Sequence, residues 1–164
     1  MKNRVRNEII AAYAKQRMAA GKSVLVIVTR INHGERLTEL IPGAVFMKGG
    51  QSAATYDRTF DALRSKQLLC LVTDTAKDGM DIPSLDCVVV ADGHKDSRLV
   101  DQRCRMMTAS PGKTSCELLD FLDNVVMLRS HALRRRRIYQ SHTGWQYREV
   151  EWGAFLNEVK GDRT

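Results

Sequence analysis

The sequence predicts an α/β fold in which helices cover a parallel β-sheet. Three short runs, at residues 24–28, 68–72 and 87–91, are continuously apolar rather than alternating. This pattern is typical of strands that are buried on both faces of a parallel sheet. Stretches with helical spacing of apolar residues alternate with these runs, as they do in strand–helix–strand units joined by right-handed crossovers.

The elements can be placed in chain order. Residues 3–20 have helical periodicity, and Gly21 supplies a stop. A strand over residues 23–28 follows, then a short helix that opens at residues 33–37 and that Pro42 closes. Residues 44–47 form a short strand, and Ser52 caps a helix over residues 53–65. After the strands at 68–72 and 87–91, we expect a helix over residues 96–107 and the last central strand over residues 115–121.

The pattern changes after residue 123, so we divide the chain into an α/β unit (1–124) and an extension packed on it (125–164). Residues 125–139 predict a helix with a strongly basic end. Residues 144–152 alternate aromatic and polar side chains, which predicts a strand, and a short helix to residue 159 follows.

Composition restricts the class of protein. The 164 residues suit one domain with a single core, and a formal net charge of +7 suits a polyanionic partner. The four cysteines lack CxxC spacing and two lie in apolar runs, so we expect free thiols and a reducing cytoplasm. We find no membrane-spanning run, no secretory signal pattern and no histidine spacing that suits a metal.

The loop after residues 68–72 is the strongest candidate for function. It carries Thr73, Asp74, Gly79 and Asp81 just beyond the end of a buried strand, which is where open α/β sheets bind ligands. Gly79 permits a close approach of the backbone to a ligand. On this loop alone, an ordinary strand-to-helix connection remains the alternative.

Two segments carry a resemblance to a known family. Residues 73–83, TDTAKDGMDIP, resemble motif V of superfamily-two helicases, and residues 101–113, DQRCRMMTASPGK, resemble motif VI. Residues 24–37 are similar to motif IV and its following helix. The resemblance covers residues 23–123 in the order of the second, C-terminal RecA-like lobe, and phage-type DNA helicases are the most similar.

The resemblance implies roles for individual residues. It places Thr73 and Asp74 against the nucleic-acid backbone, with Thr29, Arg30, Lys48 and Gly49 along the same track. It places Gly79 and Asp81 near the nucleotide. It also implies that Gln102, Arg103 and Arg105 face the nucleotide across the interface between lobes.

The chain departs from the family in motif VI. The pattern Gln-x-x-Gly-Arg-x-x-Arg is one residue short here, and the gap falls at the glycine. Arg105 then takes the first arginine position and Thr108 the second, where the family has an arginine finger. Threonine cannot replace that guanidinium. A solvated basic face remains the alternative for Arg103 and Arg105.

The elements that hold ATP in this family are missing from the sequence. There is no GxxxxGK[ST] phosphate loop, since GKT at residues 112–114 lacks the upstream glycine and precedes a strand. There is no Asp-Glu box either. We therefore expect no ATP hydrolysis by this chain alone, with ATP and magnesium bound only at a site shared with a first lobe.

The basic run at residues 134–137 is a further candidate for nucleic-acid contact, and we assign Arg134 and Arg135 to it. Four consecutive residues point in nearly every direction around a helix, so at most two serve one surface. A solvated face is the alternative. Trp145 and Tyr147 either stack on bases or pack in the core.

These observations favour a cytoplasmic (host-cytoplasmic, if phage-encoded) second lobe of a split or fragmentary helicase. It would bind single-stranded or branched DNA, with RNA as an alternative, and complete an ATP site with a separate first-lobe chain. Three alternatives remain: a non-catalytic nucleic-acid-binding or regulatory protein derived from such a lobe, an inhibitor that docks on another helicase's first lobe, and one domain of a longer chain.

Overall fold

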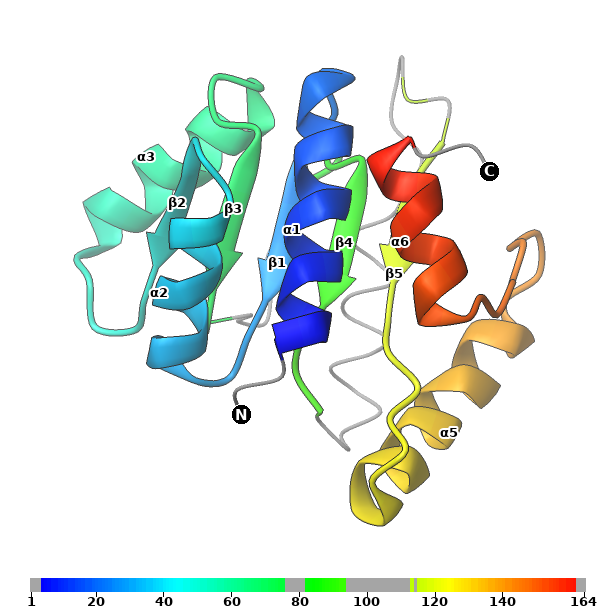
Figure 1. Ribbon diagram of the computed structural model, residues 1–164. Coiled ribbons are helices and arrows are strands. Elements are labelled where there is room, and N and C mark those ends of the chain that lie inside the picture. The colour runs from blue at the N-terminus through cyan, green and yellow to red at the C-terminus, as the bar shows by residue number, and fades with distance from the viewer. Residues whose placement is uncertain (1–3, 76–81, 94–112, 114, 162–164) are drawn as a thin grey trace.

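The computed structural model describes residues 4–75, 82–93, 113 and 115–161. Within these ranges, parallel strands form one sheet in the order β2-β3-β1-β4-β5 (Figure 1). The strands are β1 (Val24–Ile27), β2 (Ala44–Met47), β3 (Cys70–Thr73), β4 (Cys87–Val90) and β5 (Glu117–Leu119). The predicted parallel α/β architecture is confirmed.

The strands are in level register, so their carboxyl ends form one edge. Thr73 of β3 is paired with Ile27 of β1 on one side and with Met47 of β2 on the other. Val90 of β4 continues the same row. The segments that follow β1, β2 and β3 therefore emerge side by side, because neighbouring strands lie about 4.8 Å apart.

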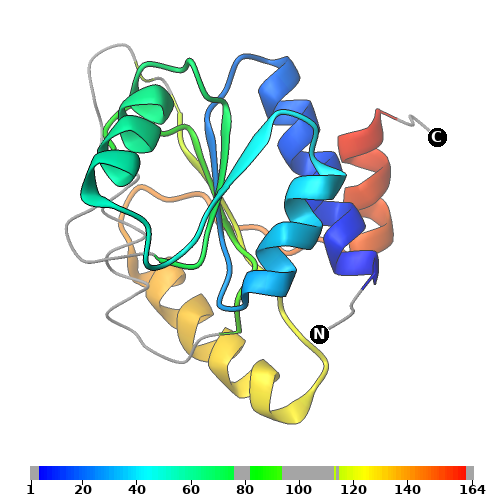
Figure 2. The same cartoon turned by 90° about the vertical axis from the view of Figure 1, so that its left-hand side faces the viewer.

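Helices cover both faces of the sheet. α1 (Arg4–Ala19), α2 (Ile31–Leu40) and α6 (Trp152–Lys160) lie on one face and α3 (Ala53–Arg64) on the other (Figure 2). Alternate residues of β1 serve the two cores: Val24 and Val26 pack with the α1 side, whereas Leu25 and Ile27 pack with the α3 side. Both faces are apolar, which explains the continuous apolar runs in the sequence.

Most predicted elements are confirmed with small shifts in their bounds. Gly21 adopts φ +69° after α1, which favours glycine and ends the helix. The Ser52 side chain accepts a hydrogen bond from the Thr55 N–H, as an N-cap does. β5 lies at the edge of the sheet rather than at a central position. The helix predicted over residues 96–107 lies outside the described residues.

The extension differs from its prediction in one element. α5 (Val126–Ser141) and α6 are helices, but residues 145–151 pair with no strand in the described part of the chain. The aromatic rings that suggested a strand pack differently: Trp145 stacks on Tyr139 and His142 at the end of α5. The strand prediction was wrong because Trp145 packs on a helix end, Tyr147 is exposed and Trp152 begins α6.

α6 packs directly on α1. The rings of Tyr13 and Phe155 stack with their centroids 6.1 Å apart, and Val159 joins the core beneath α1. None of the helices in the described ranges is long and apolar enough to cross a bilayer.

Candidate nucleic-acid interface

Three neighbouring strands deliver the predicted nucleic-acid residues to one edge of the sheet. Thr29 and Arg30 follow β1, Lys48 and Gly49 follow β2, and Asp74 follows β3, which lies between them. All three loops emerge at the edge to which the strand arrows point in Figure 1. The structure therefore brings these predicted residues together.

Asp74 ties two of these loops to each other. Its Oδ1 accepts a hydrogen bond from the Gly49 N–H at 2.9 Å. The Tyr56 hydroxyl donates to the Lys48 carbonyl at 3.0 Å and braces the same turn. The Gly49 amide is thus already engaged, and a carboxylate repels phosphate. Asp74 and Gly49 therefore shape the edge, and their contact with a phosphate backbone stays a prediction.

Thr73 also has a structural role at this edge. Its side chain is fully buried, and its Oγ1 accepts a hydrogen bond from the Thr75 N–H at 3.1 Å. The two threonine hydroxyls lie 3.1 Å apart. The hydroxyl of Thr73 therefore holds the turn after β3 and does not face solvent. Its contact with a phosphate backbone stays a prediction.

Among the described residues of this edge, the exposed cations are Arg30 and Lys48. Both side chains are exposed, and neither makes an ion pair within the described ranges. Burial lowers the pKa of nearby His33, and positive charges that include Arg6 and Arg30 lower it further. His33 is therefore neutral near pH 7, with its ring nitrogen Nε2 at 2.9 Å from Asn7 Oδ1. In the described part of this edge, the positive charge therefore comes from the solvated side chains of Arg30 and Lys48.

The basic run on α5 separates into different environments. Arg135 is 1% exposed, and its Nε and Nη2 donate to the two carboxylate oxygens of Asp120 at 2.7 and 3.0 Å. Burial lowers the pKa of Arg135, but the hydrogen bonds and negative charge of Asp120 raise it by more. Arg135 is therefore buried in an ion pair with Asp120, and its assignment to nucleic acid stays a prediction that this burial does not support.

The other three arginines of the run remain at the surface. Arg136 pairs with Glu149 at 2.9 Å, whereas Arg134 and Arg137 are exposed and make no ion pair within the described part of the chain. At most two of the four arginines serve one surface, as helical geometry requires.

The structure does not describe the residues that were predicted to face the nucleotide. Gly79, Asp81, Gln102, Arg103 and Arg105 lie outside the described residues. Among the described side chains, no group of three or more His, Cys, Asp or Glu residues has the arrangement of a metal site.

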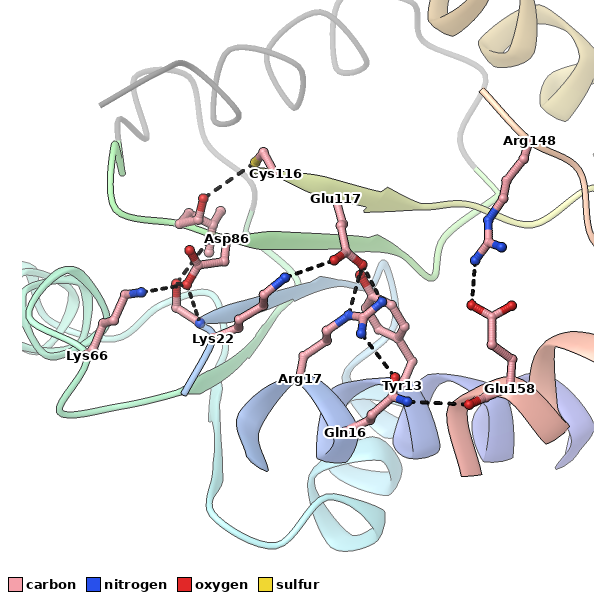
Figure 3. Close-up of polar contacts among 12 residues, drawn as sticks. Tyr13, Gln16, Arg17, Lys22, Lys66, Asp86, Cys116, Glu117, Arg148 and Glu158 are labelled. Atoms are coloured by element: carbon pink, nitrogen blue, oxygen red, sulfur yellow. Dashed lines mark hydrogen bonds and ion pairs between the residues drawn. The ribbon is translucent and has the colours of Figure 1, made fainter. Parts of the chain in front are cut away.

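A polar network at the opposite, amino-terminal edge of the sheet was missed by the sequence analysis. Glu117 of β5 accepts hydrogen bonds from the Tyr13 hydroxyl at 2.9 Å, Arg17 Nε at 2.8 Å and Lys22 Nζ at 3.1 Å (Figure 3). Burial alone would raise the pKa of Glu117, but hydrogen bonds from Lys22 and Tyr13 and the charge of Arg17 lower it by more. The sequence signal for this network was Glu117 within a mostly apolar stretch, because a partly buried carboxylate needs hydrogen-bonding partners.

A second set of polar contacts at this edge joins the start of β1 to the start of β4. The Asp86 Oδ2 accepts hydrogen bonds from the Ser23 N–H and from Lys66 Nζ, each at 2.8 Å. At the other end, Arg148 pairs with Glu158 at 2.7 Å. Glu117 thus joins β5 to α1, Asp86 joins the start of β4 to the start of β1, and Arg148 joins the segment of residues 144–151 to α6. These polar contacts hold the structure together at the amino-terminal edge.

A groove of about 1020 Å³ runs beside β5, between α1 and the segment of residues 144–151. Arginines line it, but each is paired with a glutamate: Arg17 with Glu117, Arg136 with Glu149, and Arg148 with Glu158. The groove therefore offers less uncompensated positive charge than the carboxyl edge does.

Known proteins share this fold and sequence pattern. Residues 2–105 match the family model described as "Helicase conserved C-terminal domain". Replication protein E1 of human papillomavirus 72 is 32% identical over 95 residues, which is 54% of this chain but only 14% of that protein.

Two solved structures have the same architecture. The C-terminal domain of S. cerevisiae Dbp5 aligns with a TM-score of 0.62 at 15% identity, covering 95% of this chain and 93% of that one. T4 UvsW aligns with a TM-score of 0.64 at 18% identity, covering 83% of this chain and 32% of that one. With its strand order, its level carboxyl edge and a family match over residues 2–105, the chain belongs to the helicase conserved C-terminal domain family and has the RecA-like fold of the C-terminal helicase domains that it resembles.

Proposed function

We propose that the chain binds single-stranded or branched DNA across the carboxyl edge of its sheet, as the second lobe of a helicase whose first lobe is a separate chain. The observation that carries the proposal is the pair of exposed cations, Arg30 and Lys48, at neighbouring strand ends in a chain of this family. Cations on adjacent loops attract phosphates and hold a backbone without reading its bases.

The tied loops support this use of the edge. The hydrogen bond from Gly49 to Asp74 fixes the β2 and β3 loops relative to each other, so Lys48 projects from a braced turn. S. cerevisiae Dbp5, a protein with the same fold, has been solved bound to RNA and ADP BeF3. RNA is therefore the natural competitor to include in a binding assay.

The test is a salt titration of binding to a fluorescent single strand. The double variant Arg30→Ala/Lys48→Ala should weaken binding and reduce the slope of log K against log salt by about 1.4, because each lost phosphate contact on a single strand contributes about 0.7. The matched control is Lys15→Ala/Lys160→Ala, which removes the same charge from exposed positions on α1 and α6. Equal effects in the two double variants would contradict the proposed track.

The second half of the proposal concerns ATP. The residues that the family resemblance assigns to the nucleotide, Asp81 and Arg105 among them, would complete a site on the first lobe, which would supply the phosphate loop. Co-purification from the native cell should recover a chain with such a loop, and DNA-stimulated ATP hydrolysis by the pair should fall when Asp81 is replaced by alanine.

Thr108 favours a second candidate function. It occupies the position of the family's arginine finger, so a lobe that has lost its catalytic role would retain DNA binding without a partner ATPase. DNA binding by the purified chain, with no phosphate-loop protein recovered from the native cell, would support this binding module and refute the split helicase.

A further inference from the structure

An apolar tip at the start of α5 is exposed to solvent. It comprises Leu122, Val125, Val126 and Met127, whose exposed fractions are 49%, 52%, 87% and 69%. In Figure 1 the first turn of α5 extends past the carboxyl ends of the strands, and Figure 2 shows the same from the side. The tip therefore lies on the side of the molecule that carries Arg30 and Lys48.

Folding does not account for this tip. Val125 occupies the N-cap position and makes no side-chain cap hydrogen bond, although serine, threonine, aspartate or asparagine would stabilise the helix there. Val126 and Met127 point largely into water and bury little surface. Contiguous exposed apolar side chains of this kind mark interaction sites.

The remainder of α5 indicates the kind of partner. The helix contains no aspartate or glutamate, and its exposed arginines include Arg129, Arg134 and Arg137. None of these three makes an ion pair within the described ranges of the chain, so no described carboxylate pairs with their charge. A long exposed helix face with cations alone is complementary to a polyanion.

Three carboxylates among the described residues near α5 are already paired with other arginines. Asp120 is held by the buried Arg135, Asp123 pairs with Arg6, and Glu149 pairs with Arg136. An acidic protein surface would match the arginines but would not explain an apolar tip at the outer end of the same face.

Helical geometry places the apolar and basic parts in one line. Val126 and Arg137 are roughly 20° apart around the helix axis and roughly 16 Å apart along it, since each residue advances about 100° and 1.5 Å. Arg134 and Arg129 lie on either side of this line. The outward face of α5 thus begins with an apolar tip and continues as a basic stripe.

We propose that α5 binds the junction between single-stranded and double-stranded DNA, with the apolar tip stacked on the last base pair and the basic stripe on the phosphates of one strand. Apolar side chains that meet base steps unstack them, and arginines beside them hold the backbone. The proposal rests on the DNA binding proposed above, and it assigns to α5 a preference that the carboxyl edge alone does not provide.

The probes are a forked DNA with 2-aminopurine in its last base pair, the corresponding single strand and a blunt duplex. The intact chain should bind the fork about tenfold more tightly than the single strand, as expected for burial of about one of these apolar side chains, and should raise the 2-aminopurine fluorescence. Val126→Ser/Met127→Ser should remove the preference and the fluorescence change while leaving single-strand affinity unaltered. Both side chains are exposed, so the fold should survive, which circular dichroism checks.

Two controls make the outcome decisive. Val150→Ser removes another exposed apolar side chain and should leave the fork preference intact. Arg129→Ala/Arg134→Ala/Arg137→Ala should weaken binding to every probe and reduce the salt slope. Absence of a fork preference, or its persistence in Val126→Ser/Met127→Ser, would overturn the proposal.

Sedimentation equilibrium tests whether a second copy of the chain, rather than DNA, binds the apolar tip. A wild-type dimer that Val126→Ser/Met127→Ser converts to a monomer would show that the apolar tip joins two copies of the chain, and this also overturns the proposal. Failure of the carboxyl-edge track has a different signature: Arg30→Ala/Lys48→Ala would not alter single-strand binding, while the fork preference would still depend on Val126 and Met127.

Discussion

Replacing Asp120 with alanine should reduce the free energy of unfolding by about 3–5 kcal/mol, because it leaves the buried guanidinium of Arg135 without its carboxylate. The structure sets this magnitude: the arginine is 1% exposed and donates two hydrogen bonds to Asp120. The Tyr139 hydroxyl donates a third to the same carboxylate at 3.0 Å. All three hydrogen bonds are lost together.

The assay is urea unfolding followed by circular dichroism and by tryptophan fluorescence, to which Trp145 contributes from beside Tyr139. Arg134→Ala is the matched control, since that neighbouring arginine is exposed, and it should change stability by less than about 0.5 kcal/mol. The double variant Asp120→Leu/Arg135→Met should recover most of the loss, because it removes both buried charges. A loss in Asp120→Ala no larger than in Arg134→Ala would refute the reasoning.

Two further predictions concern the sheet. The folded-state pKa of Glu117 is lowered, so its contribution to stability is complete above its unfolded pKa and disappears as the pH falls through the folded value. Glu117→Gln should therefore destabilise the protein at pH 7 and flatten its acid-dependent loss of stability in urea titrations; an unchanged pH profile would contradict this. Gly34→Ala should lower stability by about 1–3 kcal/mol, because the added Cβ would lie 2.3 Å from the ring of Phe46. Adding Phe46→Leu should restore part of that loss in thermal unfolding, and a stabilised Gly34→Ala would show that the ring moves aside.

Sequence alone predicted the sheet well because its signal is strong and local. Strands buried on both faces must be apolar throughout, and residues 24–28 and 87–91 show this directly. Glycine and serine at helix ends gave the boundaries, as the positive φ of Gly21 and the cap at Ser52 confirm. The carboxyl edge followed from parallel topology.

The role of each polar side chain was harder to predict, because it depends on a partner distant in sequence. Nothing near Arg135 shows that Asp120 lies beneath it, and nothing near Asp74 shows that its carboxylate reaches Gly49. Thr73 was placed at the correct edge, but the burial of its side chain depends on the turn that follows. Alternating aromatics such as those around Trp145 look the same whether they face a strand or a helix end.

The packing of α6 on α1 has a consequence for synthesis. Tyr13 is synthesised more than a hundred residues before Phe155 and Val159, which cover that side of the first helix. The nascent chain therefore carries an apolar strip of α1 without its cover until α6 has been made, and contacts of such long sequence separation form slowly. We therefore expect this arrangement to increase the dependence of the protein on chaperones during translation more than it slows refolding of the finished chain.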